Sequence, residues 1–269
     1  MNTILDKIVA HKKQELEITK NMIPVKKLEG SIYFEGPCIS LSRYIQRKDK
    51  TGIIAEFKRS SPSRGDLNPY ASADKIPLSY MQGGASALSI LTDQRFFKGR
   101  KEDLTAAREW NFSPILRKEF IIDEYQIIEA KSIGADAILL ILSILDEKEI
   151  KSFTKLAHDL GMEVLAEIHE SYEFVDEALE ADLLGINSRS LKEMKILDDH
   201  AIKVKEELAI NKLTIAESGI NSPEQALNLH NAGFGGFLIG SLFMKDPDPG
   251  FACRQFINQY TALLKQHKS

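Results

Sequence analysis

The 269-residue sequence has few of the features that mark secreted or membrane proteins. Its two cysteines, Cys38 and Cys253, are too few for a disulfide framework and are typical of a reducing compartment. The first 20 residues carry charges throughout and lack the apolar core of a signal peptide. The longest apolar run, Ala137–Leu142, is far shorter than the roughly 20 residues that span a bilayer. We therefore expect a cytoplasmic protein that has no membrane contact.

An excess of positive charge is also missing. The chain has 35 Lys and Arg against 39 Asp and Glu, a net charge of −4, so it lacks the basic field of a nucleic-acid-binding protein. Its six histidines are scattered, and together with the distant cysteines they show no metal-ligand spacing, so no metal is predicted. The first 50 residues nevertheless hold ten Lys and Arg and six Asp and Glu, which allows a local cationic site for an anionic ligand.

What the sequence does have is a regular alternation from Gly52 onward. Short aliphatic runs alternate with segments of helical periodicity, which is typical of parallel β-α units. Eight such units predict a single (β/α)8 TIM barrel. The main alternative, a doubly wound open sheet, lacks a G-x-G-x-x-G after its first strand. The predicted strands are Gly52–Phe57, Ala87–Leu91, Pro114–Arg117, Ala137–Leu142, Glu163–Glu167, Leu184–Asn187, Leu213–Glu217 and Gly236–Ile239.

Glycines mark the ends of several predicted helices. The segments Asp123–Ile133, Asp146–Leu160 and Pro223–Ala232 are each followed by a glycine, the residue preferred just past a helix end.

The first 50 residues lie outside the repeat. We expect residues 1–50 to form an N-terminal helical extension and residues 51–269 to form the catalytic barrel. An amphipathic helix is predicted in the extension, with an apolar side that docks on the barrel. The apolar residues of that helix are Ile4, Ile8, Leu16 and Ile18.

Polar residues gather where the predicted strands end, which is where active sites of such barrels lie. Glu56 and Lys58 are two apart on one strand and so share a face. A buried salt bridge would explain that pair alone, but other strand ends are polar too. Lysine beside carboxylates is suited to acid–base chemistry. His169 is better explained as a structural side chain. The other candidates at strand ends are Lys118, Glu167, Asn187, Arg189, Glu217 and Ser218.

The last two β-α loops and the first one predict a phosphate site. Ser218-Gly219 and Gly240-Ser241 follow the seventh and eighth strands, where barrels commonly bind phosphate through backbone N–H groups. The first loop adds Ser61 as a hydroxyl donor. Tight turns made by glycine are the alternative explanation of these loops.

The stretch Ile54–Gly65, IAEFKRSSPSRG, resembles the first strand and loop of the indole-3-glycerol-phosphate synthase family. Phe57, Ser188 and Ser190 depart from the family pattern. The resemblance continues in chain order over Ile4–Val9, Gly84–Ala85, Leu91–Asp93, Phe96–Gly99, Leu116–Asp123, Glu167, Ile186–Arg189, Glu217–Ile220 and Leu238–Ser241.

The resemblance implies a lyase of tryptophan biosynthesis. Its reaction closes the pyrrole ring of 1-(2-carboxyphenylamino)-1-deoxyribulose 5-phosphate with loss of carbon dioxide and water, and needs no cofactor. Lys118 would protonate the ketone oxygen, with Glu56 orienting it and balancing its charge. Lys58 would hold the anthranilate carboxylate and act as a second acid or a proton relay. Glu167, with a raised pKa, would protonate the leaving hydroxyl.

The remaining candidates would bind this phosphorylated small molecule. Asn187, Glu217 and Ser218 would position it, and Arg189 would support the carboxylate site. The phosphate would lie on Ser61, Gly219, Gly240 and Ser241.

Two other interpretations of the function stay open at this point. One is a related phosphate-binding barrel, such as phosphoribosylanthranilate isomerase or the tryptophan synthase α subunit. The isomerase would normally carry a cysteine near the end of its first strand, where this chain has Glu56 and Lys58. The other is a non-catalytic scaffold, which the presence of the whole acid–base set disfavours. The protein is expected to be a monomer or a homodimer.

Overall fold

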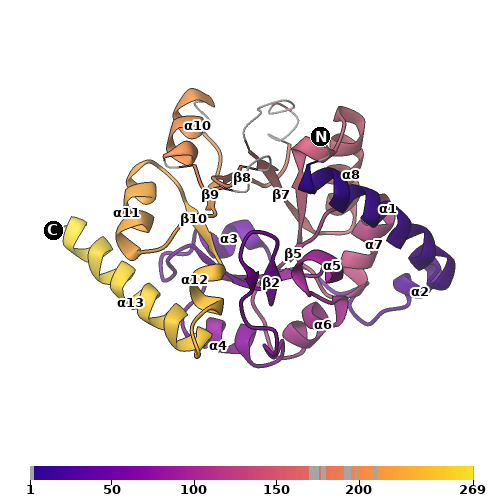
Figure 1. Ribbon diagram of the computed structural model, residues 1–269, viewed down its shortest axis with the longest axis horizontal. Coiled ribbons are helices and arrows are strands. Elements are labelled where there is room, and N and C mark those ends of the chain that lie inside the picture. The colour runs from indigo at the N-terminus through magenta and orange to yellow at the C-terminus, as the bar shows by residue number, and fades with distance from the viewer. Residues whose placement is uncertain are drawn as a thin grey trace.

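Eight parallel strands close into a barrel in the computed structural model of the chain, which describes residues 3–169, 176, 180–190, 195–197, 199–208 and 211–268 (Figure 1). Each strand pairs with its successor and the last pairs with the first, so the expected (β/α)8 TIM barrel is confirmed. The strands are β1 Ile53–Phe57, β4 Ala87–Leu91, β5 Ile115–Lys118, β6 Ala137–Ile141, β7 Glu163–Ile168, β8 Leu183–Asn187, β9 Thr214–Glu217 and β10 Gly236–Ile239.

Side chains on each strand alternate between the barrel interior and the outer helices. The interior cluster includes Ile54, Leu116 and Leu165, whereas their neighbours along the strands, such as Ala55 and Ile115, belong to the cluster beneath the helices. Both faces of the sheet are therefore apolar, which explains why the strands appear in the sequence as nearly continuous aliphatic runs.

The helices surround the barrel, and a short hairpin lies over its mouth. Helices α7, α8 and α11 begin at the side-chain caps Asp123, Asp146 and Ser222, and the glycines just past their ends have positive φ, as the sequence predicts. The helices are α4 Ile76–Gln82, α5 Gln94–Phe97, α6 Lys101–Glu109, α7 Glu124–Ser132, α8 Glu147–Asp159, α10 His200–Leu208, α11 Pro223–Asn231, α12 Ser241–Met244 and α13 Pro249–Lys268, with a 3-10 turn at Leu142–Ile144; the hairpin pairs β2 Ser60–Ser61 with β3 Gly65–Asp66.

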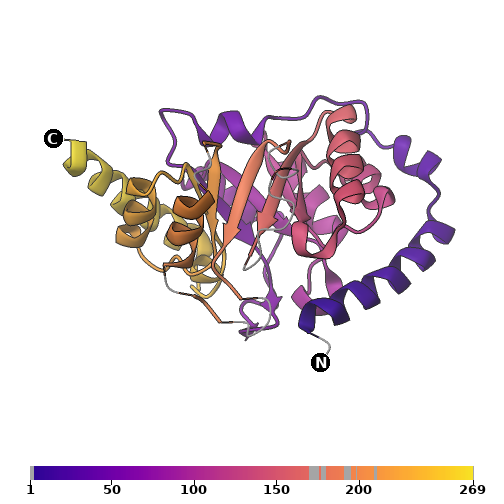
Figure 2. The ribbon, with the colours of Figure 1, turned by 90° about the horizontal axis from the view of Figure 1, so that it is seen from above.

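The segment before the barrel holds α1 Ile4–Met22, α2 Val25–Glu29 and α3 Leu41–Ile45. Figure 2 shows α1 starting on the side where the strands end, after which the chain runs outside the barrel to its opposite side. There Leu41 and Ile45 of α3 join the interior cluster. This segment before the barrel, which we call the lead segment, therefore contacts both ends of the barrel.

One expectation for α1 is wrong. Its buried face is formed by Leu5, Ile8, Lys12 and Leu16, whereas Ile18 is 62% exposed. Ile18 lies two residues past Leu16, which places it about 200° further round the helix. The buried face instead includes a lysine. Among the described helices, none combines the length and apolarity that crossing a membrane requires.

Candidate active site

A pocket opens at the end of the barrel where the strands terminate, and every candidate named from the sequence lines it. The interior pattern explains this. Glu56 and Lys58 follow Ile54 on β1 at intervals of two, and Glu167 follows Leu165 on β7 in the same way. The pocket is therefore lined by the polar continuation of the inward-facing aliphatic rows. The candidates lining it are Glu56, Lys58, Ser61, Lys118, Glu167, Asn187, Arg189, Glu217, Ser218, Gly219, Gly240 and Ser241.

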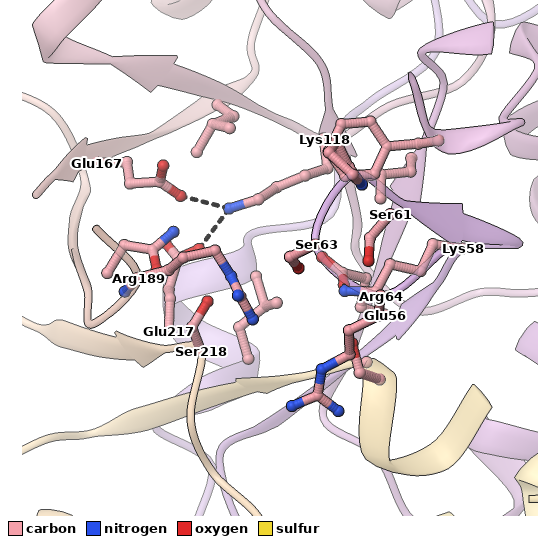
Figure 3. Close-up of a pocket in the computed structure, with 18 of the residues that line it drawn as sticks. Glu56, Lys58, Ser61, Ser63, Arg64, Lys118, Glu167, Arg189, Glu217 and Ser218 are labelled. Carbon is pink, nitrogen blue, oxygen red and sulfur yellow. Dashed lines mark hydrogen bonds and ion pairs between the residues drawn. The ribbon is translucent and has the colours of Figure 1, made fainter. Parts of the chain in front are cut away.

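Lys118 lies between two buried carboxylates at the floor of the pocket (Figure 3). Its Nζ is 2.6 Å from Glu167 Oε2 and also donates to Glu217 Oε2. Burial by itself lowers the pKa of Lys118, but the negative charges of Glu167 and Glu217 outweigh this and raise it above its usual range. Lys118 is thus an ammonium group that reaches the pocket.

The pKa values of the two carboxylates shift in opposite directions. Burial raises the pKa of Glu167, but Lys118 and His169 overcome this and bring it down to about 2. His169 Nε2 is 3.2 Å from Glu167 Oε1. For Glu217, burial and then the negative charge of Glu167 raise the pKa well above its usual range. The expectation of a raised pKa at Glu167 is therefore wrong, and the carboxyl group with the raised pKa is Glu217.

Lys58 and Glu56 form a separate ion pair on another side of the pocket (Figure 3). Glu56 was expected to orient Lys118 and to balance its charge. Glu56 accepts a hydrogen bond from Lys58, and its negative charge also helps to raise the pKa of Lys118, after the charges of Glu167 and Glu217. Glu56 therefore pairs with Lys58 and also contributes to the charge balance of Lys118.

Two glycines make room for carboxylates in this site. A β-carbon on Gly240 would collide with the side chain of Glu56, and one on Gly185 would collide with Glu217. The sequence analysis named Gly240 as a residue whose backbone could approach phosphate. The space needed by Glu56 is a second reason for a glycine at this position.

Asn187, Arg189 and Ser218 line the part of the pocket formed by the ends of β8 and β9. Asn187 Oδ1 accepts a hydrogen bond from the backbone N–H of Arg189 at 3.0 Å. Burial lowers the pKa of Arg189, and the positive charge of Arg64 adds to this effect. Ser218 and Gly219 both have positive φ, 64° and 78°, so the backbone turns sharply here.

Ser61 Oγ is buried and makes no hydrogen bond to any residue that the structure describes. A buried hydroxyl normally has a partner. Because Ser61 also lines the pocket, its hydroxyl is available to a ligand.

The apolar side of the pocket is formed in part by α1, the helix that the family resemblance implies helps to cover the substrate, and in part by two phenylalanines that sequence reasoning missed. Ile4, Leu5 and Ile8 of α1 line it together with Phe97 and Phe120, whose ring centroids are 6.0 Å apart. The i, i+3, i+4 spacing of the α1 residues predicts an apolar helix face, and the family resemblance implies that this helix lies over the substrate.

Two carboxylates near that apolar side were also missed as pocket residues. Asp93 follows β4 and Glu119 follows Lys118 at the end of β5, and both line the pocket. Among the described residues, no group of His, Cys, Asp and Glu is arranged to hold a metal ion.

Phe57, one of the residues that depart from the family pattern, is buried in the cluster beneath the outer helices. Its parity is opposite to that of Glu56 and Lys58, so it packs behind the pocket. Ser188 and Ser190 are buried, and their backbone N–H groups donate to Glu217 O and Lys195 O. Phe57 therefore affects packing under the outer helices, and Ser188 and Ser190 lie in the backbone contacts that follow β8.

This sequence matches the model of a known protein family and the sequences of its members. The sequence model of the family described as "Indole-3-glycerol phosphate synthase" matches residues 5–256. The protein of that name from Bacteroides thetaiotaomicron is 42% identical over 257 residues, covering 96% of this chain and 98% of the relative. Its namesake from Carboxydothermus hydrogenoformans is 41% identical over 258 residues, covering 92% and 97%.

Solved structures with a similar fold include tryptophan synthase α subunits. A mutant from Pyrococcus furiosus superposes with a TM-score of 0.60 at 13% identity, covering 80% of this chain and 99% of that chain. The subunit from Legionella pneumophila gives 0.61 at 14% identity, covering 84% and 97%. At such low identity the likeness concerns the fold alone.

Proposed function

This chain belongs to the indole-3-glycerol phosphate synthase family, and from that premise we propose which of its residues carry out the reaction. The reaction converts 1-(2-carboxyphenylamino)-1-deoxyribulose 5-phosphate to indole-3-glycerol phosphate, carbon dioxide and water, a decarboxylating step of tryptophan biosynthesis. The observation that carries the proposal is the Lys118 ammonium between Glu167 and Glu217, in one pocket with the Lys58–Glu56 pair.

Ring closure is assigned to Lys118. When the aromatic carbon that bears the carboxylate attacks the ketone, negative charge develops on the ketone oxygen, and the Lys118 ammonium protonates it. Lys58, held by Glu56, binds the anthranilate carboxylate until it leaves as carbon dioxide, and Arg189 supports that site. Loss of carbon dioxide returns the bonding electrons to the ring, which becomes aromatic again.

Dehydration is assigned to the two glutamates. The acid form of Glu217 protonates the hydroxyl, which leaves as water, and the ionised Glu167 accepts the proton lost from the neighbouring ring carbon. Transfer of that proton from Glu167 to Glu217 restores both groups, and Lys118 regains its proton from solvent. Asn187 and Ser218 position the intermediate in this scheme.

The phosphate is assigned to the loops after β1, β9 and β10. Ser61 supplies its buried hydroxyl, and Gly219, Gly240 and Ser241 supply backbone N–H groups. Binding the remote phosphate holds the reacting end of the substrate in a productive position.

Several wider features belong to the same proposal. We assign the protein to the cytoplasm, which its free cysteines Cys38 and Cys253 support. Residues 1–50 act as a helical extension of the catalytic barrel formed by residues 51–269. The protein works as a monomer or a homodimer, and its chemistry uses side chains without a cofactor.

The direct test is an assay of the purified protein with the carboxyphenylamino substrate in the presence of a metal chelator. We expect the fluorescence of the indole product to rise and carbon dioxide to be released in equal amount. The Lys118→Ala variant is the matched control and should still fold. Absence of indole product at saturating substrate would overturn the proposed function.

A further inference from the structure

The buried face of α1 contains a lysine that the proposed mechanism does not use. Lys12 is 1% exposed and lies one turn beyond Ile8 on the same face of the helix. Its Nζ contacts three carboxylates: Glu15 at 2.9 Å on its own helix, and Asp93 and Glu119 at 3.1 Å each on the barrel. A fully buried ammonium requires such partners.

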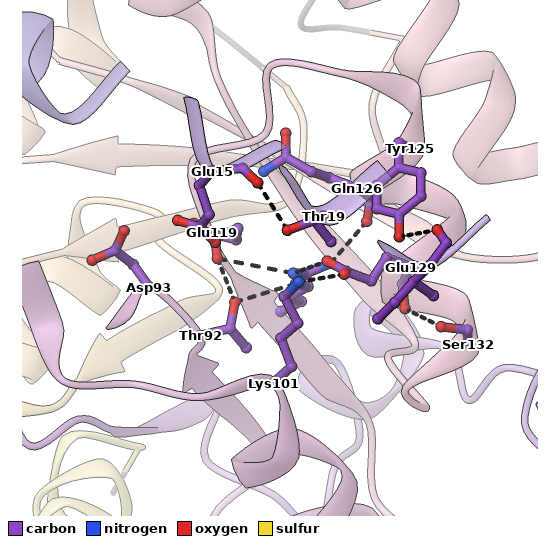
Figure 4. A network of polar contacts seen from close by, with 12 residues as sticks. Glu15, Thr19, Thr92, Asp93, Lys101, Glu119, Tyr125, Gln126, Glu129 and Ser132 are labelled. Atoms are coloured by element: carbon purple, nitrogen blue, oxygen red, sulfur yellow. Dashed lines mark hydrogen bonds and ion pairs between the residues drawn. The ribbon is translucent and has the colours of Figure 1, made fainter. Parts of the chain in front are cut away.

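The barrel carboxylates are held independently of α1. Asp93 accepts from the backbone N–H of Phe96 at 2.7 Å and caps α5. Figure 4 shows Glu119 and Asp93 at one side of a polar network, in which Thr92 Oγ1 donates to Glu119 at 2.7 Å. Arg117 continues this network by donating to Thr92 and Glu129. The position of Lys12 is therefore set by groups fixed to β4 and β5.

Both carboxylates line the substrate pocket, whereas Lys12 lies behind it. The part of α1 that reaches the pocket is the preceding two turns, with Ile4, Leu5 and Ile8. Lys12 is thus the charged contact next to the pocket-lining end of α1. A second ion pair between α1 and the barrel, Lys20 with Asp123, is 43% and 32% exposed at its side chains. An exposed pair of that kind contributes little to binding two elements together.

We propose that Lys12 is a positioning residue for substrate binding. Its ion pairs with Asp93 and Glu119 hold Ile4, Leu5 and Ile8 of α1 in place as the apolar wall against which the aromatic end of the substrate packs. The identity of that substrate rests on the proposed function. Because such a wall contacts substrate and transition state alike, its displacement weakens binding more than it slows the chemical steps.

Lys12→Met keeps the apolar stem and removes the charge. We expect KM for the substrate to rise about tenfold with kcat within about threefold of the parent, the pattern of lost uniform binding. Inhibition by inorganic phosphate should be unchanged, because the phosphate loops lie outside this contact. Lys20→Met is the matched control and should leave both constants at parent values.

A second variant separates positioning from folding. Removing Lys12 alone leaves buried carboxylates without their cation, which can unfold the protein. Asp93→Asn retains a side chain that caps α5, so the double variant Lys12→Met/Asp93→Asn is compared with Asp93→Asn alone. The same tenfold rise in KM is expected between these two. An equal KM in both would overturn the proposal.

A third comparison uses the wall itself. Ile8→Ala should raise KM without touching the buried charges, and its effect should be less than additive with Lys12→Met, because both act through one wall. Full additivity, or a parallel loss of phosphate inhibition, would assign Lys12 a general structural role and overturn the proposal.

Hydrogen exchange distinguishes failure of this inference from failure of the proposed function. Without any substrate, the amides of Leu5–Ile8 should exchange faster in Lys12→Met than in the parent or in Lys20→Met. If Lys12→Met exchanges faster but the parent protein forms no indole product, the proposed function is wrong and the role of Lys12 in holding α1 is still supported. Unchanged exchange would overturn the role of Lys12 whatever the activity.

Discussion

Two buried clusters in this protein each place a lysine among carboxylates, but they differ in their access to the pocket. In one, Lys118 lies between Glu167 and Glu217; in the other, Lys12 contacts Asp93 and Glu119 of the barrel and Glu15 of its own helix. The side chain of Lys118 is 13% exposed and reaches the pocket, whereas that of Lys12 is 2% exposed and is covered by its helix. A lysine between carboxylates therefore does not by itself identify a catalytic group, and contact with the pocket is what favours the role proposed for Lys118.

Each cluster also separates the pKa values of its two carboxylates. Burial raises the pKa of Asp93, while Lys12 and Arg117 lower that of Glu119 despite its burial. In the pocket, burial and Glu167 raise the pKa of Glu217, while Lys118 and His169 lower that of Glu167 despite its burial. In each cluster, the carboxylate with the lowered pKa has a second basic side chain beside it, Arg117 for Glu119 and His169 for Glu167.

The largest effect should come from the accessible lysine. Lys118→Ala is expected to lower kcat by about a thousandfold, the scale of a lost general acid, whereas Lys12→Met keeps most of its kcat. Steady-state rates at saturating substrate measure both, with thermal unfolding as the check on folding. Equal losses of kcat in the two variants would contradict the idea that only the lysine that reaches the pocket takes part in the reaction.

Glu217→Gln is expected to lower kcat by about a hundredfold, because the amide keeps the shape of the acid and cannot deliver its proton. In the parent, burial and the negative charge of Glu167 raise the pKa of Glu217, so its acid form persists to higher pH than that of a free glutamate and kcat should fall as the pH rises through that pKa. Glu167, with a pKa of about 2, stays ionised over the whole assay range. The pH profile of kcat should lose its Glu217 step in the variant. An unchanged profile would assign that step to another group.

Ser61→Ala is expected to raise KM by about tenfold with kcat retained, as for the loss of one hydrogen bond to a charged oxygen. Inhibition by inorganic phosphate should weaken in parallel, because the same hydroxyl binds the free ion. Lys12→Met raises KM without this parallel change, so the two variants mark opposite ends of the substrate. Phosphate inhibition at the parent level in Ser61→Ala would place the phosphate elsewhere.

The smallest effect concerns the exposed ion pair of α1. Lys20→Met should change the free energy of unfolding by less than about 0.5 kcal/mol, because solvent screens the Lys20–Asp123 pair. Chemical denaturation measures this directly. A loss of several kcal/mol would show that burial is not what separates Lys12 from Lys20.

The fold was predictable because its pattern is local. Aliphatic runs, helix caps such as Asp146 and terminal glycines such as Gly161 lie next to the elements that they define, and the observed boundaries differ from the predicted ones by a residue or so. The inward row of Glu56 and Lys58 follows from the two-residue period of a strand. The same reasoning placed Lys118 and Glu167 at the strand ends.

The carboxylates that pair with each lysine could not be predicted in this way. The sequence places Glu56, Glu167 and Glu217 at one mouth but does not say which of them contacts Lys118, because that depends on distances across the barrel. The division of pKa values between Glu167 and Glu217 depends on the same distances. Lys12 looks like one charge of a solvated helix face until its partners Asp93 and Glu119, distant in sequence, are placed beside it.

The path of the lead segment has a consequence for the order of folding. Lys12 needs carboxylates from the ends of two neighbouring strands, and α3 packs Leu41 and Ile45 against an interior that several strands build together. Such contacts between distant parts of the chain form after local ones. We therefore expect this segment, although it precedes the barrel in the chain, to complete its contacts after the barrel strands have paired. Pulse-labelled hydrogen exchange during refolding should find α1 protected later than β4 and β5.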